Sequence, residues 1–177
     1  MNTKIKDSGH HQQFYDKDGN ELAVRDMDLT KPRIVLMPLT EIAGIIDDHV
    51  FSIVDEIINT KDVEGKIKAT QDVIEVLQRL RGWNNYEMLY EVGQHFTDGC
   101  EKYGDNNWTK GMPTLNFINS GLRHYIKWQQ FMEHAKDGEM FDPNDERHDR
   151  AMLWNFICLK WMLIHKPELD DTDTMKK

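Results

Sequence analysis

The chain is poor in the residues and runs that mark several common protein classes. It has only two cysteines, Cys100 and Cys158, and neither belongs to a CxxC pair, so no zinc-knuckle or redox motif is visible. Each lies in an apolar helical pattern, which predicts a reduced core cysteine. There is no run of about 18 apolar residues, and the first residues lack the apolar core of a signal peptide. We therefore expect a soluble, cytoplasmic protein with no membrane partner.

The sequence is also poor in positive charge. Its 22 lysines and arginines are outnumbered by 31 aspartates and glutamates, which gives a net charge of −9. Proteins that bind duplex DNA or anionic membranes need clustered positive charge, so neither partner is expected. A small anionic substrate remains compatible with this composition, because a local group of basic residues or a divalent metal can hold it.

Apolar residues recur at helical spacing along most of the chain, and no alternating strand pattern competes with them. The predicted helices cover 39–60 and about 64–81, 85–100, 114–135 and 145–165. We expect an all-α fold, a MazG-like bundle of about five helices over 39–167. Residues 1–38 are predicted to form an extended N-terminal arm, whose apolar run 34–38 is either a short strand or an anchor on the core. The charged segment 168–177 is predicted to be a flexible tail.

The predicted third helix carries a polar stripe opposite its apolar one. The apolar stripe is Leu89, Val92, Phe96 and Cys100. At about 100° per residue, the opposite face holds Glu87, Glu91, His95 and Asp98. Stacked carboxylates repel one another, and a divalent cation such as Mg²⁺ or Mn²⁺ would remove that cost. The alternative is a solvated face on an acidic protein.

The predicted fourth helix carries a basic stripe instead. One face holds Asn116, Asn119, Ser120, Arg123 and Lys127, and the other holds Leu115, Ile118, Leu122, Tyr125 and Ile126. Arginine and lysine one turn apart, with amides and a hydroxyl beside them, can hold phosphate oxygens. A solvated polar face is again the alternative.

The start of the predicted fifth helix is acidic. Asp145, Glu146 and Asp149 lie where negative charge suits the helix dipole. The alternative is that Glu146 and Asp149, three residues apart, form part of a metal site. His148 and Asn155 share a face of this helix, and Asn155 lies in an otherwise apolar stretch. A buried asparagine must be hydrogen-bonded, so it either fixes a helix contact or faces a ligand.

Together the stripes supply acid, metal ligands and positive charge. Metal-assisted hydrolysis of a phosphoanhydride uses all of these. The loop 101–113 joins the acidic helix to the basic one. Its Gly104, Gly111 and Pro113 supply the turn, whereas Trp108 is either a hydrophobic plug or a stacking surface.

Three motifs of the chain occur together in a known family. They are KYGDNNWTKGMP at 102–113, SGLRHYIKW at 120–128 and DERHDRAMLWN at 145–155. In this combination they resemble the phage and bacterial dATP/dGTP diphosphohydrolases, which are MazG-like, all-α nucleoside triphosphate pyrophosphohydrolases. The segment from Gln13 to Pro38 is similar to the N-terminal part of that family, so the resemblance covers most of 13–165.

The resemblance implies hydrolysis of a purine deoxynucleoside triphosphate, dATP or dGTP, to the monophosphate and pyrophosphate in a bacterial or phage-infected cell. It implies Mg²⁺ or Mn²⁺ bound by Glu87, Glu91, Glu146 and Asp149, with Glu91, Glu146 and Asp149 as the catalytic carboxylates. The implied substrate-binding residues are Arg25, Lys102, Asn107, Trp108, Arg123, His124, Lys127, His148 and Asn155. MazG-like bundles usually cover apolar faces with partner subunits, so a homodimer or homotetramer is expected.

The chain departs from the family pattern at three places. The stretch from about 60 to 86 resembles an insertion relative to shorter members of the family. Many relatives have a second histidine where this chain has Ala151. Glu146 and Asp149 match the ExxD half of the general MazG-like metal motif, but Glu87 and Glu91 are spaced ExxxE rather than ExxE. These departures leave room for a nucleotide-binding protein without turnover on the same scaffold. A third hypothesis is a phage helical interaction protein that binds no nucleotide.

Overall fold

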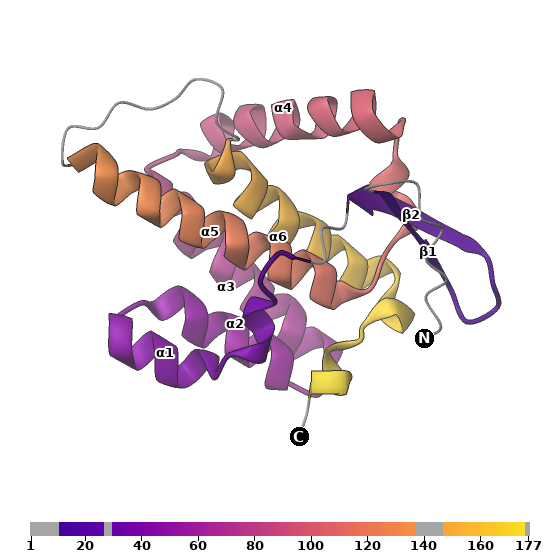
Figure 1. Ribbon diagram of the computed structural model, residues 1–177, viewed down its shortest axis with the longest axis horizontal. Helices are drawn as coiled ribbons and strands as arrows, with labels where there is room; N and C mark the ends of the chain where they lie inside the picture. Colours follow the sequence, from indigo (N-terminus) through magenta and orange to yellow (C-terminus); the bar gives the residue numbers. More distant parts are fainter. Residues whose placement is uncertain (1–10, 27–29, 137–146, 176–177) are drawn as a thin grey trace.

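The computed structural model describes residues 11–26, 30–136 and 147–175, and it is mainly helical (Figure 1). Its helices are α1 Leu39–Ile46, α2 His49–Asn59, α3 Val63–Arg81, α4 Asn85–Tyr103, α5 Thr114–Lys136 and α6 His148–His165. Two short strands, β1 His11–Tyr15 and β2 Glu21–Asp26, and four 3-10 segments complete the described elements. The predicted all-α helical bundle is confirmed.

Helix α6 is the centre of the bundle. It packs on α5, α3 and α4, and its side chains Phe156, Leu159 and Met162 have no exposed surface. Such complete burial explains why α6 is apolar on nearly all sides, since a helix surrounded by others has no solvated face. Cys158 is buried and unpaired as predicted, and burial raises the pKa of its thiol. Cys100 is also a free thiol but only half-buried.

The predicted single helix over 39–60 is wrong, because the structure has α1 and α2 there. The break falls at Asp47, whose φ of 53° lies in the left-handed region that ends a helix. Asp48 then caps α2 by accepting a hydrogen bond from the Val50 amide. The apolar spacing runs on through both helices, so the periodicity alone does not reveal this break.

Helix α4 is bound to the bundle by less of its surface than predicted. Val92 is its one buried residue, whereas Leu89, which we expected in the apolar stripe, is 63% exposed. The helix begins with a capping box, in which Asn84 accepts from the Glu87 amide and the Glu87 carboxylate accepts from the Asn84 amide. Glu87 therefore has a structural role at the start of the helix.

The N-terminal arm contains an antiparallel hairpin, which the sequence analysis did not predict as strands. Strand β2 lies against the 3-10 segment η2, Asn107–Lys110, and the Ala23 amide donates to the Gly111 carbonyl. Further along, Ile34–Leu36 forms the 3-10 segment η1, and Ile34 and Val35 are buried. Of the two alternatives for 34–38, the structure shows the anchor on the core.

The expected flexible tail is packed onto the bundle as far as Met175. It forms the 3-10 segments η3, Pro167–Leu169, and η4, Thr172–Met175. Asp170 pairs there with Lys66 of α3, whose side chain is almost fully buried. Within the described ranges, no helix has the length and apolar character needed to cross a membrane.

Candidate functional site

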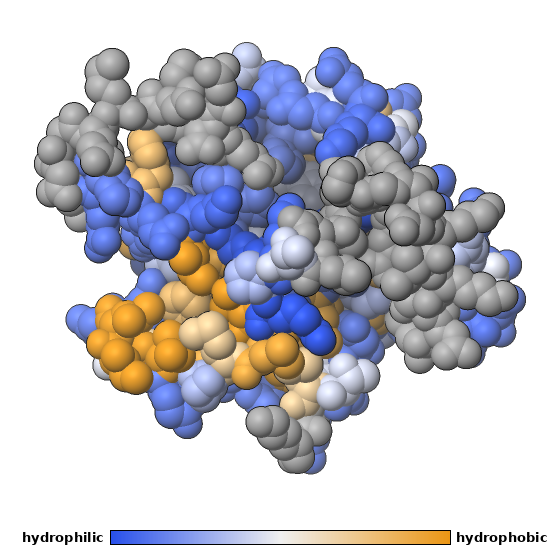
Figure 2. Space-filling view, in the orientation of Figure 1, coloured by the Kyte–Doolittle hydropathy of each residue, from blue (hydrophilic) through white to orange (hydrophobic). Residues whose placement is uncertain are grey.

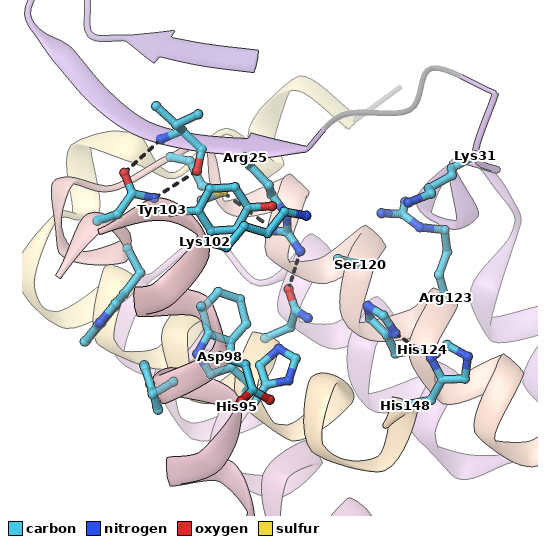
Figure 3. Close-up of a pocket in the computed structure, with 18 of the residues that line it drawn as sticks. Arg25, Lys31, His95, Asp98, Lys102, Tyr103, Ser120, Arg123, His124 and His148 are labelled. Atoms are coloured by element: carbon cyan, nitrogen blue, oxygen red, sulfur yellow. Dashed lines mark hydrogen bonds between the residues drawn. The ribbon is translucent and has the colours of Figure 1, made fainter. Parts of the chain in front are cut away.

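A cavity of about 680 Å³ lies between α4, α5, α6 and the arm (Figure 3). Strand β2 contributes Val24 and Arg25, α4 contributes His95 and Asp98, and α6 contributes Asn155. This volume falls in the usual range for pockets that bind small molecules.

The lining of the cavity is positively charged. It includes the lysine and arginine side chains Arg25, Lys31, Lys102, Arg123 and Lys127. Among the described residues, Asp98 is the one carboxylate that lines it. The basic stripe predicted on the fourth helix is thus the wall that α5 gives to the cavity, with Ser120 on the same face.

Arg25 is positioned by a buried asparagine of α6. One guanidinium nitrogen donates to Asn155 Oδ1 over 2.9 Å, and the Asn155 amide donates to the Ala151 carbonyl over 2.7 Å. The guanidinium carbon also lies 5.7 Å from the centre of the Phe117 ring. Asn155 therefore does both things that the sequence left open: it fixes a contact between elements, and it faces the cavity.

Two histidines meet at the other side of the cavity in Figure 3. Nδ1 of His124 on α5 lies 2.9 Å from Nδ1 of His148, the first residue of α6. Burial is the largest cause that lowers the pKa of His124 to about 2, and electrostatic effects of His148, Arg25, His95 and Arg123 lower it further. His124 is therefore a neutral imidazole at physiological pH, which can donate from one ring nitrogen and accept at the other.

The loop 101–113 holds the hairpin and fills the core beside the cavity. The Asn107 side chain makes two hydrogen bonds with the Val24 backbone. Its Oδ1 accepts from the Val24 amide at 3.2 Å, and its Nδ2 donates to the Val24 carbonyl at 2.9 Å. The Trp108 ring packs between Phe96 and Trp161 at centroid distances of 5.3 and 5.0 Å. Both residues also line the cavity. Of the alternatives for Trp108, this packing favours the hydrophobic plug.

Three of the predicted metal-binding carboxylates, Glu87, Glu91 and Asp149, lie outside the cavity lining. Glu91 accepts hydrogen bonds from Arg147 and Arg150 at 3.2 and 2.6 Å. Asp149 accepts from Arg81 at 2.8 Å and from Arg147 at 2.9 Å. Burial alone would raise the pKa of the Asp149 carboxyl, but the arginines outweigh it and hold the pKa below its usual value.

A cation would have to displace these arginines to reach Glu91 or Asp149. Glu87 is engaged in the capping box, and Glu146 lies outside the described residues. In the described part of the chain, no three histidines, cysteines or carboxylates are grouped so that they could hold a metal. The assignment of the carboxylates to metal binding or catalysis stays a prediction.

All nine residues that the sequence assigned to substrate binding line the cavity: Arg25, Lys102, Asn107, Trp108, Arg123, His124, Lys127, His148 and Asn155. Sequence reasoning did not single out Lys31, Tyr103 and Trp154, which line it too. The sequence offered one signal for them, since Tyr103 and Trp154 belong to the motifs of the family resemblance. Lys31 carried the same kind of signal, since it lies in the segment from Gln13 to Pro38 that is similar to the N-terminal part of the family.

Fold and cavity together define a helical domain with a cationic pocket. Comparison with protein-family models matches residues 66–172 to the family described as dATP/dGTP diphosphohydrolase, N-terminal. The match covers more than half of the chain, and the chain belongs to this family. No curated protein and no solved structure matches it. The matched range holds every helix that lines the cavity but not the arm that supplies Arg25 and Lys31.

Proposed function

We propose that the chain hydrolyses the purine deoxynucleoside triphosphates dATP and dGTP to the monophosphate and pyrophosphate. The observation that carries this proposal is the charge of the cavity, where five basic side chains accompany one carboxylate in a chain of net charge −9. A local excess of positive charge attracts an anionic ligand. The family description names dATP and dGTP, and the triphosphate group makes both of them anions.

The triphosphate is proposed to lie against Arg123, Lys127 and Lys31. In Figure 3, Arg123 and Lys31 occupy the same side of the cavity as the two histidines. A guanidinium can hold two phosphate oxygens at once, and an ammonium adds positive charge without fixed direction. The base would then lie at the opposite side, where Tyr103 and Arg25 are found. The flat ring of Tyr103 offers a surface for stacking.

The reaction needs charge stabilisation and a base. A water oxygen forms a bond to the α-phosphorus, the bond from that phosphorus to the bridging oxygen breaks, and pyrophosphate leaves with the electron pair. Basic side chains already aimed at the phosphates stabilise the negative charge that develops. The water proton passes to a carboxylate, for which Glu91, Glu146 and Asp149 are the predicted candidates.

Mg²⁺ or Mn²⁺ belongs to the proposal, with the same carboxylates and Glu87 as its predicted ligands. The described carboxylates do not fit a cation as they are arranged, because arginines occupy Glu91 and Asp149 and neither residue lines the cavity.

The same arginine pairs favour a second candidate function, a nucleotide-binding protein without turnover. If Glu91 and Asp149 keep their arginines when a nucleotide binds, neither can act as a base. This protein would still bind dATP or dGTP through the cationic cavity. Product analysis separates the two functions.

A homodimer or homotetramer is also part of the proposal. Apolar side chains are exposed on and just before α1, namely Leu36, Met37, Ile45 and Ile46. Figure 2, in the orientation of Figure 1, shows an orange, apolar area on the surface over α1. Covering such a patch with a second subunit would remove apolar area from water. Light scattering after size exclusion measures the mass of the particle.

Binding of the nucleotide tests the role of the cavity first. We expect dATP and dGTP to bind, and Arg123→Gln to weaken binding by about tenfold or more, because a charged hydrogen bond contributes about 1.5–3 kcal/mol. Isothermal titration calorimetry with non-hydrolysable analogues measures the affinity. The matched control is Arg79→Gln, an exposed arginine of α3 outside the cavity lining. Equal affinities for the wild type and Arg123→Gln would exclude the assigned phosphate site.

A further inference from the structure

The histidine pair of the cavity has a geometry that suits a metal ion. His124 comes from the middle of α5 and His148 is the first residue of α6, and their Nδ1 atoms face each other. Their Nδ1 atoms are 2.9 Å apart, and their rings are tilted by 42° with centroids 5.1 Å apart. Two imidazole nitrogens bound at about 2.1 Å and at a right angle to one ion lie about 3 Å apart.

We propose that His124 and His148 bind one divalent transition-metal ion through their Nδ1 atoms, with the phosphates of the nucleotide completing its coordination. A right angle between ligands is typical of six-coordinate Mn²⁺, Fe²⁺, Co²⁺ or Ni²⁺, and imidazole is a better ligand for these ions than for Mg²⁺. Glu91 and Asp149 are not part of this site, because both are paired with arginines outside the cavity lining. The inference rests on the proposed function, because it takes the nucleotide phosphates as further ligands.

The proposed metal ion needs phosphate oxygens for two reasons: as further ligands, and as negative charge that offsets the basic side chains of the cavity. In the described part of the chain no third histidine, cysteine or carboxylate is grouped with the pair. The proposal assigns the other coordination positions to water and to phosphate oxygens. Arg25 and Arg123 also line the cavity, and their positive charge repels a free cation. A triphosphate reverses the local charge, so we expect the ion to bind far more tightly with nucleotide than alone.

The alternative explanation for the 2.9 Å distance between the two Nδ1 atoms is a hydrogen bond between two neutral imidazoles. In that account one Nδ1 carries the proton and the other accepts it. The two accounts differ in what a glutamine at position 148 does. Its amide nitrogen can replace the hydrogen-bond donor, but the side chain no longer offers an imidazole nitrogen to a metal.

Electron spin-echo spectroscopy of Mn²⁺ decides between them, because nitrogen bound to Mn²⁺ gives a ¹⁴N modulation. The samples are the full chain with Mn²⁺ alone and with Mn²⁺ plus a non-hydrolysable dGTP analogue. We expect the modulation in the nucleotide sample, its loss in His124→Gln and in His148→Gln, and its retention in His134→Ala, an exposed histidine of the same helix α5. We also expect affinity for Mn²⁺ to fall at least tenfold in both glutamine variants.

The opposite result is the absence of histidine-dependent modulation in both wild-type samples, which overturns the metal site. Calorimetry of the analogue in EDTA, on the same preparations, reports separately on the cavity. If the analogue binds there without any modulation from Mn²⁺, the metal site fails and the nucleotide site stands. If the analogue does not bind, the proposed function fails, and the sample with Mn²⁺ alone still decides whether the histidines hold a metal. Circular dichroism and thermal melting confirm that each variant is folded.

Discussion

At the scale of single residues, the cavity depends on side chains that hold other side chains in place. Arg25 comes from the arm, and Asn155 fixes its guanidinium over the cavity. Asn155 has a second bond, to the Ala151 carbonyl, so its amide orientation is set by its own helix. Because the guanidinium is held before any ligand arrives, binding loses less conformational freedom.

Asn155→Ala tests this positioning. The substitution removes the acceptor for Arg25, so we expect the affinity for dATP and dGTP analogues to fall by about tenfold, in line with about 1.5–3 kcal/mol for a hydrogen bond to a charged group. Calorimetry measures it, and Asn59→Ala on the exposed face of α2 is the control. An affinity that stays at the wild-type value, in a variant that remains folded, would rule out the positioning role.

Individual site residues were predictable from sequence to different degrees. The basic face of α5 follows from helical spacing, which is a local property, so Arg123 and Lys127 could be assigned to one wall. The partners of Glu91 could not be foreseen, because Arg147 and Arg150 approach it from another helix. Tertiary packing decides which acidic residues pair with arginine, and the helical spacing of residues in the sequence does not reveal that packing.

At the scale of elements, the loop after α4 and the C-terminal segment support each other. Gly111 adopts a φ of 88° and accepts a hydrogen bond from Ala23 of β2. A Cβ at this position would collide with Leu169 of η3. The glycine thus lets the loop, the hairpin and the C-terminal segment meet at one point.

Gly111→Ala is expected to destabilise the protein by roughly 2 kcal/mol, because it combines a strained backbone with a steric clash. Urea unfolding followed by circular dichroism measures the loss. Gly93→Ala is the matched control, since Gly93 lies on the exposed face of α4 with open space around it. We expect the control to keep its stability or gain up to about 1 kcal/mol. Equal stabilities of both variants would contradict the packing described for Gly111.

The pair of Lys66 and Asp170 joins α3 to the C-terminal segment. Burial alone would raise the pKa of Asp170, but hydrogen bonds from Lys66 and Thr172 outweigh it and hold the pKa below its usual value. The folded state therefore keeps Asp170 charged at pH values where the unfolded chain takes up a proton. The contribution to stability is complete above about pH 4 and is lost as the pH falls through the folded pKa.

Asp170→Asn leaves the buried Lys66 ammonium without its carboxylate, so we expect a loss of about 3 kcal/mol at pH 7. The deficit relative to wild type should shrink as the pH falls below about 4, because the wild-type carboxylate is then protonated as well. Urea unfolding at a series of pH values gives both quantities, beside Glu133→Gln on the exposed surface of α5. A deficit that does not change with pH would show that charge is not its cause.

Element boundaries show where sequence reasoning fails for the fold. The predicted helices over about 64–81, 85–100 and 114–135 correspond to α3, α4 and α5, because glycine and asparagine at their ends give local signals. The break at Asp47 lacks that signal, since no glycine, the usual residue at a left-handed helix end, stands there. The hairpin was missed because β2 is held partly by the Asn107 side chain and the Gly111 carbonyl, and the arm alone carries no alternating pattern.

At the scale of the whole molecule, an acidic chain surrounds a basic cavity. The family match covers the helices, whereas Arg25 and Lys31 come from the preceding arm. The arm is tied down by Asn107 of the loop and closes one side of the cavity (Figure 3). The cavity is therefore formed by the arm and the bundle together.

The most direct test of the account is product analysis with each common nucleoside triphosphate, in Mg²⁺ and in Mn²⁺, resolved by chromatography. We predict deoxynucleoside monophosphate and pyrophosphate from dATP and dGTP, with turnover lost in Arg123→Gln and in Glu91→Gln. Arg79→Gln should behave as the wild type. Nucleotide binding without products, from folded protein supplied with either metal, would contradict hydrolysis and leave the nucleotide-binding function in its place.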